Sequence, residues 1–147
     1  PDRLITGITH LPNIAQIKIK LSDQDKARET VLFKCLAAVG VSIDLINVFP
    51  EIKIFTIAES DLTKASHALE QAGFKAEITP GLAKVSVVGA GMRGVPGVMA
   101  QIVEVLNSVG IEILQTADSH ATISCLVRAE DTQKAICALH KGFALGK

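Results

Sequence analysis

Between residues 15 and 78 the hydrophobic positions follow the two periods of regular secondary structure in turn. A stretch in which every second residue is apolar predicts a β-strand with one buried face. Apolar residues three and four positions apart predict an amphipathic helix, and a following glycine ends it. The pattern predicts strands over Ala15–Leu21, Val41–Val48, Ile52–Ile57 and Phe74–Ile78. It also predicts two helices, one carrying Val31, Leu32, Cys35, Leu36 and Val39 before Gly40, and a second carrying Leu62, Ala65, Ala68 and Leu69 before Gly73. Asp23 to Asp25 and Ser60-Asp61 are suited to cap these two helices.

Residues 84–140 repeat this order of elements. Strands are predicted over Lys84–Gly89, Ile111–Thr116 and Ala121–Val127, one helix carries Val98, Ile102, Val105, Leu106 and Val109 before Gly110, and a last helix covers Asp131–His140. The copies align at a constant offset of 70 residues: Leu36, Val39, Gly40 and Ile43 match Leu106, Val109, Gly110 and Ile113, and Asp61, Lys64, Ala65, Ala68 and Leu69 match Asp131, Lys134, Ala135, Ala138 and Leu139. Identities in register over two separate stretches indicate an internal duplication.

The order β-α-β-β-α-β in each copy predicts an α+β fold made of two ferredoxin-like modules, each with two helices on one face of an antiparallel sheet. The second copy lacks a convincing fourth strand, because residues 142–147 are short and only weakly strand-like. The strand-like segment Leu4–Thr9 has no partner in the first copy. We therefore expect the first module, residues 15–80, to be inserted into the second, residues 3–10 plus 83–145.

Composition narrows the functional classes. The formal net charge of the 147 residues is zero and aromatic residues make up 3%, which disfavours a dedicated nucleic-acid binder. No apolar run is long enough to span a bilayer and no signal peptide opens the chain, so a cytoplasmic protein is expected. Its three cysteines, Cys35, Cys125 and Cys137, are expected to be small buried apolar residues. Because the first residue is Pro1, the chain is expected to be a processed product or a piece of something longer.

Few motifs carry chemistry. Gly89-Ala-Gly91-Met-Arg-Gly94 follows a strand and fits a dinucleotide-binding fingerprint, with Glu112 near the position of a ribose-binding acid. Against a nicotinamide enzyme, the strand ending near Thr116 leads through a short turn into another strand instead of a crossover helix. The pair Cys137 and His140 is too isolated to predict zinc, and no metal site is expected. No catalytic residue is predicted.

At this point the residues resemble a known family. Lys84-Val-Ser-Val-Val-Gly-Ala-Gly-Met-Arg-Gly-Val-Pro-Gly-Val98 and Ile111-Glu-Ile-Leu-Gln-Thr-Ala-Asp-Ser119 are similar to the second ACT module of aspartate kinases, and Leu4–Ile8 and Ala138–Phe143 resemble the edges of that regulatory region. The resemblance implies two ACT modules, the first inserted in the second. It is closest to the lysine- or diaminopimelate-sensitive bacterial enzymes.

The resemblance also implies a regulatory function. Aspartate kinases transfer a phosphoryl group from ATP to the side-chain carboxylate of aspartate, the first step toward lysine, threonine and methionine. Their ACT modules bind end-product amino acids and inhibit the kinase. ATP and magnesium would belong to a kinase domain that these residues do not include, so no cofactor is expected here. The implied partners are an amino-acid effector, a second copy of the chain and the kinase domain or subunit, with no nucleic acid and no membrane.

Family effector pockets lie between two modules, often across a dimer. The resemblance implies a first pocket that uses the second module's Pro-Gly loop and the first module's second strand, namely Val95, Gly97, Val98, Met99, Gln101 and Ser119 with Ser42, Ile43 and Asp44. A second pocket would use Asp23, Asn47, Gly110, Glu112 and Ile113. Where the family's first loop reads Asp-x-Pro-Gly, this chain has Asp23-Gln-Asp-Lys26, and the second pocket is in question for that reason.

Physical reasoning favours the first pocket. Backbone N–H groups at a helix start attract a carboxylate, and Asp44 or Glu112 would pair with the second ammonium of lysine or diaminopimelate. Three hypotheses stay open: an amino-acid sensor, an assembly module that only dimerises the kinase because its pockets have decayed, and a dinucleotide-dependent enzyme.

Overall fold

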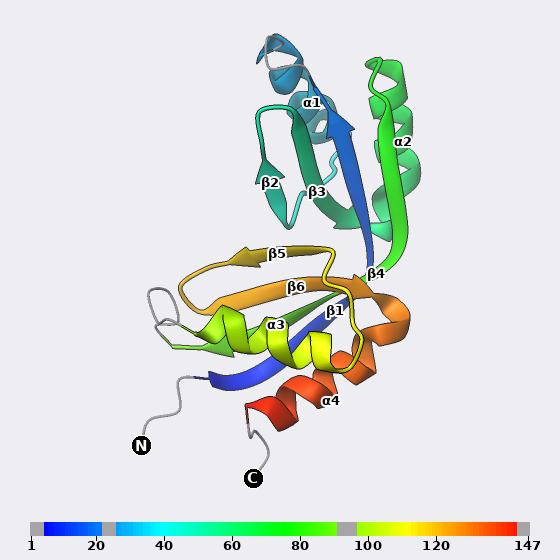
Figure 1. Ribbon diagram of the computed structural model, residues 1–147. Coiled ribbons are helices and arrows are strands. Elements are labelled where there is room, and N and C mark those ends of the chain that lie inside the picture. Colours follow the sequence, from blue (N-terminus) through cyan, green and yellow to red (C-terminus); the bar gives the residue numbers. More distant parts are fainter. Residues whose placement is uncertain (1–4, 22–25, 91–96, 144–147) are drawn as a thin grey trace. The chain divides into compact units, whose positions relative to one another are not determined.

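The computed structural model describes residues 5–21, 26–90 and 97–143. This described part contains six strands, four α-helices and two single-turn 3-10 helices (Figure 1). In chain order they are β1 (Ile5–Lys20), α1 (Lys26–Ala38), β2 (Ile46–Val48), β3 (Ile52–Ala58), η1 (Glu59–Asp61), α2 (Leu62–Gln71), β4 (Ala76–Gly89), α3 (Val98–Ser108), β5 (Gln115–Asp118), β6 (Thr122–Arg128), η2 (Ala129–Asp131) and α4 (Thr132–Gly142).

The chain divides into two compact units. Residues 13–81 form one, which we name the insert unit, and residues 1–12 with 82–147 form the other, the split unit. The strand order is β2-β3-β1-β4-β6-β5, and the described pairings β1–β3, β2–β3, β4–β6 and β5–β6 are antiparallel. The first four strands of this order serve the insert unit and the last four serve the split unit, so each has a ferredoxin-like order. The predicted α+β class with two such modules is confirmed.

Strands β1 and β4 each run from one unit into the other. The sequence predicted two separate strands for each of them, over Leu4–Thr9 and Ala15–Leu21 and over Phe74–Ile78 and Lys84–Gly89. This prediction is wrong, because each strand is continuous. Asn13 and Gly81 adopt left-handed backbone, with φ of 59° and 74°, and they lie at the two ends of the insert unit. A single residue with positive φ redirects a strand without ending it, which a local turn signal cannot reveal.

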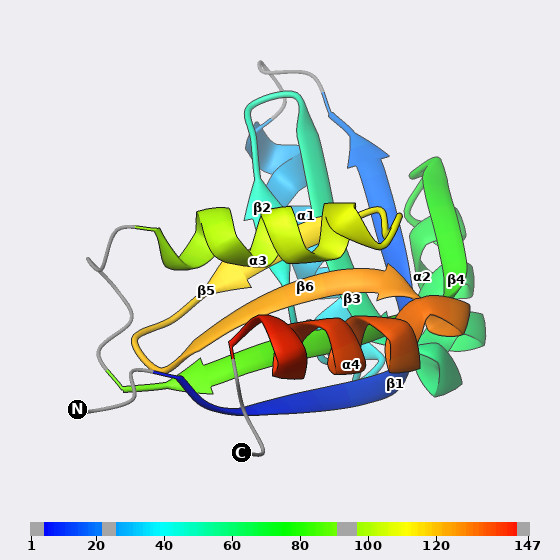
Figure 2. The same ribbon diagram turned by 60° about the horizontal axis from the view of Figure 1, so that its bottom comes forward.

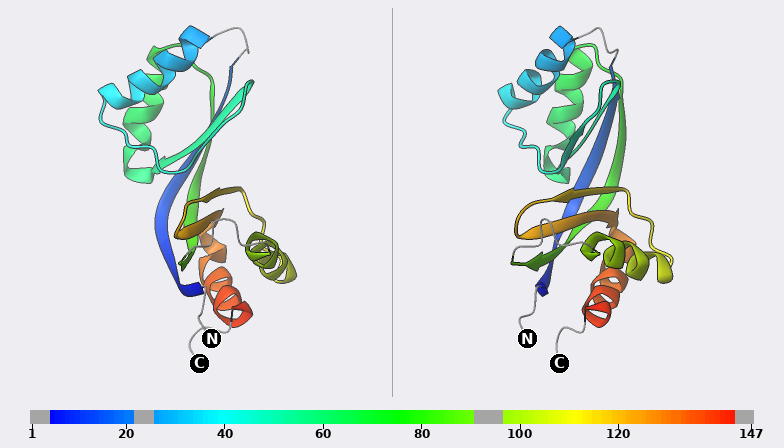
Figure 3. Two further views of the ribbon diagram at one scale, coloured as in Figure 1. Left: turned by 90° about the vertical axis from the view of Figure 1, so that its left-hand side faces the viewer. Right: turned by 60° about the vertical axis from the view of Figure 1, so that its left-hand side comes forward.

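The insert unit places α1 and α2 on one face of its strands (Figure 3). Strand β1 pairs with β3 from Ile14 opposite Ala58 to Lys20 opposite Ile52. Every second residue of these strands faces the helices, which produces a core of Ala15, Ile17, Ile19, Leu32, Leu36, Val41, Phe55, Ile57, Ala65, Leu69 and Phe74. The apolar stripe predicted for α1 is narrower than expected. Val31 and Val39 are 41% and 39% exposed, because Val31 lies on the flank of the helix and Val39 follows its last turn.

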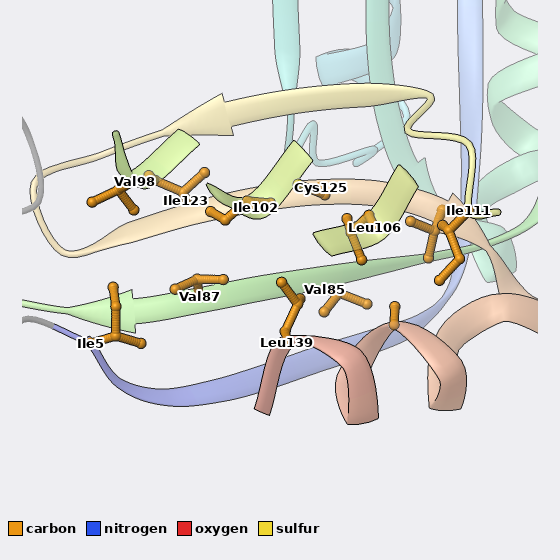
Figure 4. Close-up of a cluster of buried hydrophobic side chains, with 12 residues drawn as sticks. Ile5, Val85, Val87, Val98, Ile102, Leu106, Ile111, Ile123, Cys125 and Leu139 are labelled. Atoms are coloured by element: carbon orange, nitrogen blue, oxygen red, sulfur yellow. The ribbon is translucent and has the colours of Figure 1, made fainter. Parts of the chain in front are cut away.

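The split unit repeats the arrangement with α3 and α4 on one face of its strands (Figure 2). Strand β4 pairs with β6 from Leu82 opposite Arg128 to Val88 opposite Thr122. Side chains of α3 and α4 meet those of β4 and β6 in a core without a buried charge among its members (Figure 4): Ile5, Val85, Val87, Val98, Ile102, Leu106, Ile111, Ile123, Cys125, Val127, Ala135 and Leu139. Ile5 of the leading segment thus packs in the same core as β4 and β6.

The 70-residue offset is visible in the backbone itself. Strand β3 matches β6 residue for residue, and η1 matches η2. Gly40 and Gly110 end α1 and α3 with φ of 77° and 75°, and the next residue in each copy donates its N–H to the carbonyl of Leu36 or Leu106 at 3.0 Å. Glycine is required there because a Cβ is unfavourable at this φ.

One local prediction is wrong in both copies, and another is wrong in the insert unit. The second strands were expected over Val41–Val48 and Ile111–Thr116, but they begin only at Ile46 and Gln115. In the insert unit the Asp44 N–H donates to the Thr56 carbonyl, and the Leu45 N–H donates to Thr56 Oγ1. Two residues thus lie opposite one, which interrupts the regular hydrogen-bond ladder. The side chains of Ser60 and Asp61 do not cap a helix, although this was predicted. They belong to η1, and Asp61 pairs with Lys64 at 3.2 Å. The capping predicted for Asp23 to Asp25 and the end of the chain after Phe143 lie outside the described residues.

Candidate functional site

The residues predicted for the first effector pocket fall into two groups. Gly97, Val98, Met99 and Gln101 lie at the start of α3 and Ser119 in the turn between β5 and β6, all in the split unit. Ser42, Ile43 and Asp44 lie between α1 and β2 in the insert unit. Val95 of the first pocket and Asp23 of the second lie outside the described residues.

The start of α3 offers backbone donors. Gly97 is its N-cap with a left-handed φ of 90°, and the first helical hydrogen bond runs from the N–H of Gln101 to the Gly97 carbonyl at 2.9 Å. The N–H groups of residues 98–100 therefore have no partner within the helix. Within the described residues no side chain caps this helix, and its first turn contains no acid. The positive end of the helix dipole is thus suited to a carboxylate ligand.

Side chains at the start of α3 serve the core more than the surface. Val98 is buried and Met99 packs against the core of the split unit (Figure 4 shows Val98 beside Ile123). Gln101 is exposed, and its Nε2 donates to the carbonyl of Gly142 at 2.9 Å. A ligand at this helix start would therefore contact backbone at residues 98 and 99. The Ser119 hydroxyl lies 2.9 Å from Thr122 Oγ1 and accepts from the Thr122 N–H at 3.2 Å, so it also shapes its turn.

The insert-unit group differs in character. Ser42 and Asp44 are exposed, whereas Ile43 packs against the core of the insert unit. The Asp44 N–H donates to the Thr56 carbonyl at 3.0 Å, which fixes the backbone at this point. The Ser42 and Asp44 side chains are therefore presented at the surface by a segment whose backbone is held in place.

The described residues of the second predicted pocket are already engaged. Gly110 forms the left-handed turn after α3, and Ile113 packs against the split-unit core. Asn47 lies on β2 opposite Ile54. Glu112 Oε1 accepts from Arg128 Nη2 at 3.0 Å, in a solvent-exposed ion pair. Arg128 thus satisfies the carboxylate that was predicted as one possible partner for a ligand ammonium.

Sequence reasoning missed an ion pair in the insert unit between a buried lysine and a half-exposed glutamate. Lys53 is 1% exposed, and its Nζ lies 3.3 Å from Glu29 Oε2 in the first turn of α1. The same Nζ donates to the carbonyl of Phe49 and, at 3.4 Å, to that of Pro50. The alternation of Lys53, Phe55 and Ile57 puts the lysine on the buried face of β3, and this was the signal available in the sequence.

A separate hollow of about 410 Å³ lies in the insert unit, lined by Lys18, Lys20, Ile52, Lys75, Ala76 and Glu77. None of the predicted effector residues lines it. In the part of the chain that the structure describes, no group of three histidine, cysteine or acidic side chains is suited to hold a metal ion.

The cysteines differ in exposure. Cys125 is buried in the split-unit core, and burial raises the pKa of its thiol to about 11. Burial also raises the pKa of the half-buried Cys35. Cys137 is exposed, which corrects the prediction that all three are buried. Cys137 is exposed because it lies on the outward face of α4.

Comparison with known proteins identifies the family. Residues 77–141 match the family model described as ACT domain. The crystal structure of the regulatory subunit of aspartate kinase from Thermus thermophilus superposes with a TM-score of 0.86 at 32% identity, covering 95% of this chain and 99% of that one. The chain belongs to the family of aspartate kinase regulatory regions.

Other relatives extend this result. Aspartokinase 1 of Bacillus subtilis is 41% identical over 146 residues, which cover 99% of this chain but 36% of the relative. The chain therefore spans about a third of the length of the curated relatives that it matches. The crystal structure of aspartokinase alpha and beta subunits gives a TM-score of 0.88 at 26% identity, covering 96% of this chain and 99% of that one.

Membership of this regulatory family agrees with the chemistry of the described residues. The antiparallel pairing of β4 with β6 contradicts a doubly wound dinucleotide fold, so the alternative of a nicotinamide enzyme is wrong. Residues 91–94 of the glycine motif lie outside the described part. No described helix is long and apolar enough to cross a membrane.

Proposed function

We propose that this chain is the sensing region of an aspartate kinase, the enzyme that phosphorylates the side-chain carboxylate of aspartate, and that it binds an end-product amino acid. Lysine or diaminopimelate is the favoured effector, ahead of threonine. The observation that carries the proposal is the near-complete match to a regulatory subunit of aspartate kinase, in which almost every residue of each chain is covered.

The start of α3 supports a carboxylate-binding role. Its backbone N–H groups at residues 98–100 have no acidic side chain in the first turn to compete with a ligand. A hydrogen bond to a charged group contributes about 1.5–3 kcal/mol, and micromolar affinity needs about 8 kcal/mol, so several contacts must converge. In our proposal Ser42 and Asp44 supply contacts to the ammonium groups, and the other predicted residues of this first pocket are Val95, Gly97, Gln101 and Ser119.

Discrimination between effectors would depend on the distal end of the ligand. A second ammonium favours an acidic partner, and Glu112 is already paired with Arg128 at 3.0 Å. Asp44, which is exposed at the surface of the insert unit, is our candidate to select lysine or diaminopimelate. Regulation would follow from a population shift, because a ligand that binds two arrangements of the chain unequally changes their equilibrium. The partners proposed for this step are a second copy of the chain and a catalytic domain or subunit, where ATP and magnesium would bind.

Calorimetric titration of the purified chain with lysine, diaminopimelate and threonine tests the proposal. We expect saturable heat with lysine or diaminopimelate. Absence of binding by all three at saturating concentration, in a sample with a native thermal transition, would contradict the sensor function and favour the assembly-module alternative.

Two variants sharpen the titration. Ser119→Phe introduces the residue that the insert unit has at the equivalent position, Phe49, and it should abolish binding by filling the split-unit turn. Asp44→Ala should weaken lysine at least tenfold and leave threonine almost unchanged, because only lysine carries the second ammonium. Lys141→Ala, on exposed α4, is a matched surface control for which both affinities should be unchanged.

A further inference from the structure

Lys53 is the only charged residue classed as buried in the described part of the chain. Its ammonium meets three oxygen atoms: Glu29 Oε2, the Phe49 carbonyl and the Pro50 carbonyl. A lysine ammonium has three donors and no acceptor, so this oxygen set satisfies it. The carboxylate comes from the first turn of α1, and the two carbonyls come from the turn between β2 and β3. The four residues form a filled ammonium site within the insert unit.

The 70-residue offset relates this site to the split unit. Glu29 matches Met99, Phe49 matches Ser119 and Lys53 matches Ile123. Met99 and Ser119 are two of the residues predicted to contact an effector. Ile123, on β6, belongs to the core cluster against which Met99 packs. In the insert unit, therefore, two of the three partners of the Lys53 ammonium, Glu29 and Phe49, stand where the split unit has candidate effector residues.

The charges of the pair also mimic those of an amino acid. The Glu29 carboxylate lies in the first turn of α1, where a helix start favours a negative charge. The Lys53 ammonium lies 3.3 Å from it. At the start of α3 the described residues provide neither charge, because Met99 and Ile123 are apolar and belong to the core region. A ligand carboxylate at α3 would supply what Glu29 supplies at α1.

We propose that Glu29 and Lys53 occupy, from within the chain, the place in the insert unit that corresponds to the effector site of the split unit. The chain then binds one amino acid per chain and not two. This inference rests on the proposed sensor function for its stoichiometry, but its structural half, a filled ammonium site, is testable without any effector.

The stoichiometry is measured by calorimetry on the wild-type chain. One equivalent of lysine or diaminopimelate per chain is expected. Two equivalents would overturn the inference while the sensor function stands. No binding at all would reject the sensor function and, with it, the stated stoichiometry, and the ammonium site would then be judged by the rescue experiment alone.

The rescue experiment empties the site. Lys53→Ala should lower the melting temperature, and n-butylammonium chloride should restore part of the loss in a saturable manner, because its ammonium has the same three donors. Tetramethylammonium chloride, which has the charge but no N–H, should not. Lys64→Ala removes an exposed lysine and is the matched control, with no rescue by either salt expected. Equal effects of the two salts on Lys53→Ala would overturn the proposed ammonium site.

A measurement on the wild-type chain covers the case in which Lys53→Ala does not fold. With ¹⁵N-labelled lysine, the side-chain ammonium of Lys53 should give a slowly exchanging NMR signal, because it is sequestered by three oxygens. The exposed ammonium groups of Lys64 and Lys134 should exchange too fast to be seen. If Lys53 exchanges as fast as these two, the filled site does not exist and the inference fails.

Discussion

The two units share one backbone plan but differ at the start of their first helices. In the insert unit α1 carries Glu29, which pairs with the buried Lys53 on β3. In the split unit the equivalent residues are Met99 and Ile123, and both contribute to an apolar core region. The fold therefore accommodates either an ion pair or an apolar pair at these equivalent positions. With the apolar pair, the first turn of α3 contains no acid. With the ion pair, the first turn of α1 contains Glu29.

This difference between the two units helps to distinguish a stabilising role of the Glu29–Lys53 pair from a functional one. An ion pair with one buried member, such as Lys53 with the half-exposed Glu29, is seldom more stabilising than a well-packed apolar pair of similar volume. The presence of Glu29 and Lys53 is thus not explained by stability alone, and a filled site is the explanation that we favour. Conversely, a first turn without an acid, as in α3, is the feature expected of a unit that receives its anion from solution.

The largest expected effect comes from placing the lysine of the ion pair, without its glutamate, at the equivalent position of the split unit. Ile123→Lys buries an ammonium against Met99 with no carboxylate, which should destabilise the chain by about 4 kcal/mol. Adding Met99→Glu should recover about 1–3 kcal/mol of this loss. Urea denaturation of the single and double variants measures both values. A double variant no more stable than Ile123→Lys would show that the two backbones are less equivalent than the offset indicates.

The next effect exploits a second non-equivalent pair, Cys125 in the split unit and Phe55 in the insert unit. Burial raises the pKa of the folded thiol from its ordinary value of 9.0 to about 11, so the folded state holds its proton at a pH where the unfolded state has lost it. Stability from this residue is complete below pH 9 and is lost as the pH rises toward 11, by about 2–3 kcal/mol in total.

Urea titrations between pH 8 and pH 11 measure this loss. In Cys125→Ala the alkaline decline should be shallower by that amount, with the residual slope due to other groups. An unchanged slope would mean that the Cys125 thiol ionises equally well in the folded state.

The smallest effect tests where the units are alike. Gly40 and Gly110 both hold φ near 75°, and a Cβ added at either position would meet no atom closer than 3.9 Å. Gly40→Ala and Gly110→Ala should therefore each cost about 1–2 kcal/mol through backbone strain alone. Thermal denaturation compares them, and a difference above about 1 kcal/mol would reveal an environment that the repeat does not share.

The elements were predictable where the information is local. Gly40, Gly73 and Gly110 correctly indicated helix ends, because glycine tolerates the left-handed turn that each end requires. The late start of β2 was not predictable, since the apolar residues Val41 and Leu45 are buried without belonging to a regular ladder. Hydrophobicity records burial and not hydrogen bonding.

The candidate site was predictable only as a set of positions. Gly97 and Pro96 indicated a helix start able to bind an anion, and the backbone of α3 agrees for the described residues. The engagement of Glu112 by Arg128 and of Gln101 by the Gly142 carbonyl depends on residues 16 and 41 positions away. Such partners leave no periodic signal in the chain.

The sequence by itself determined that two copies of one unit follow each other at a constant offset, because helix and strand periods and turn glycines act over a few residues. Only the tertiary structure decided that β1 and β4 are continuous strands serving both units, and that Lys53 meets Glu29 and its own hairpin. Both outcomes depend on which distant groups the folded chain brings together to satisfy backbone and charge, and no local pattern specifies those partners.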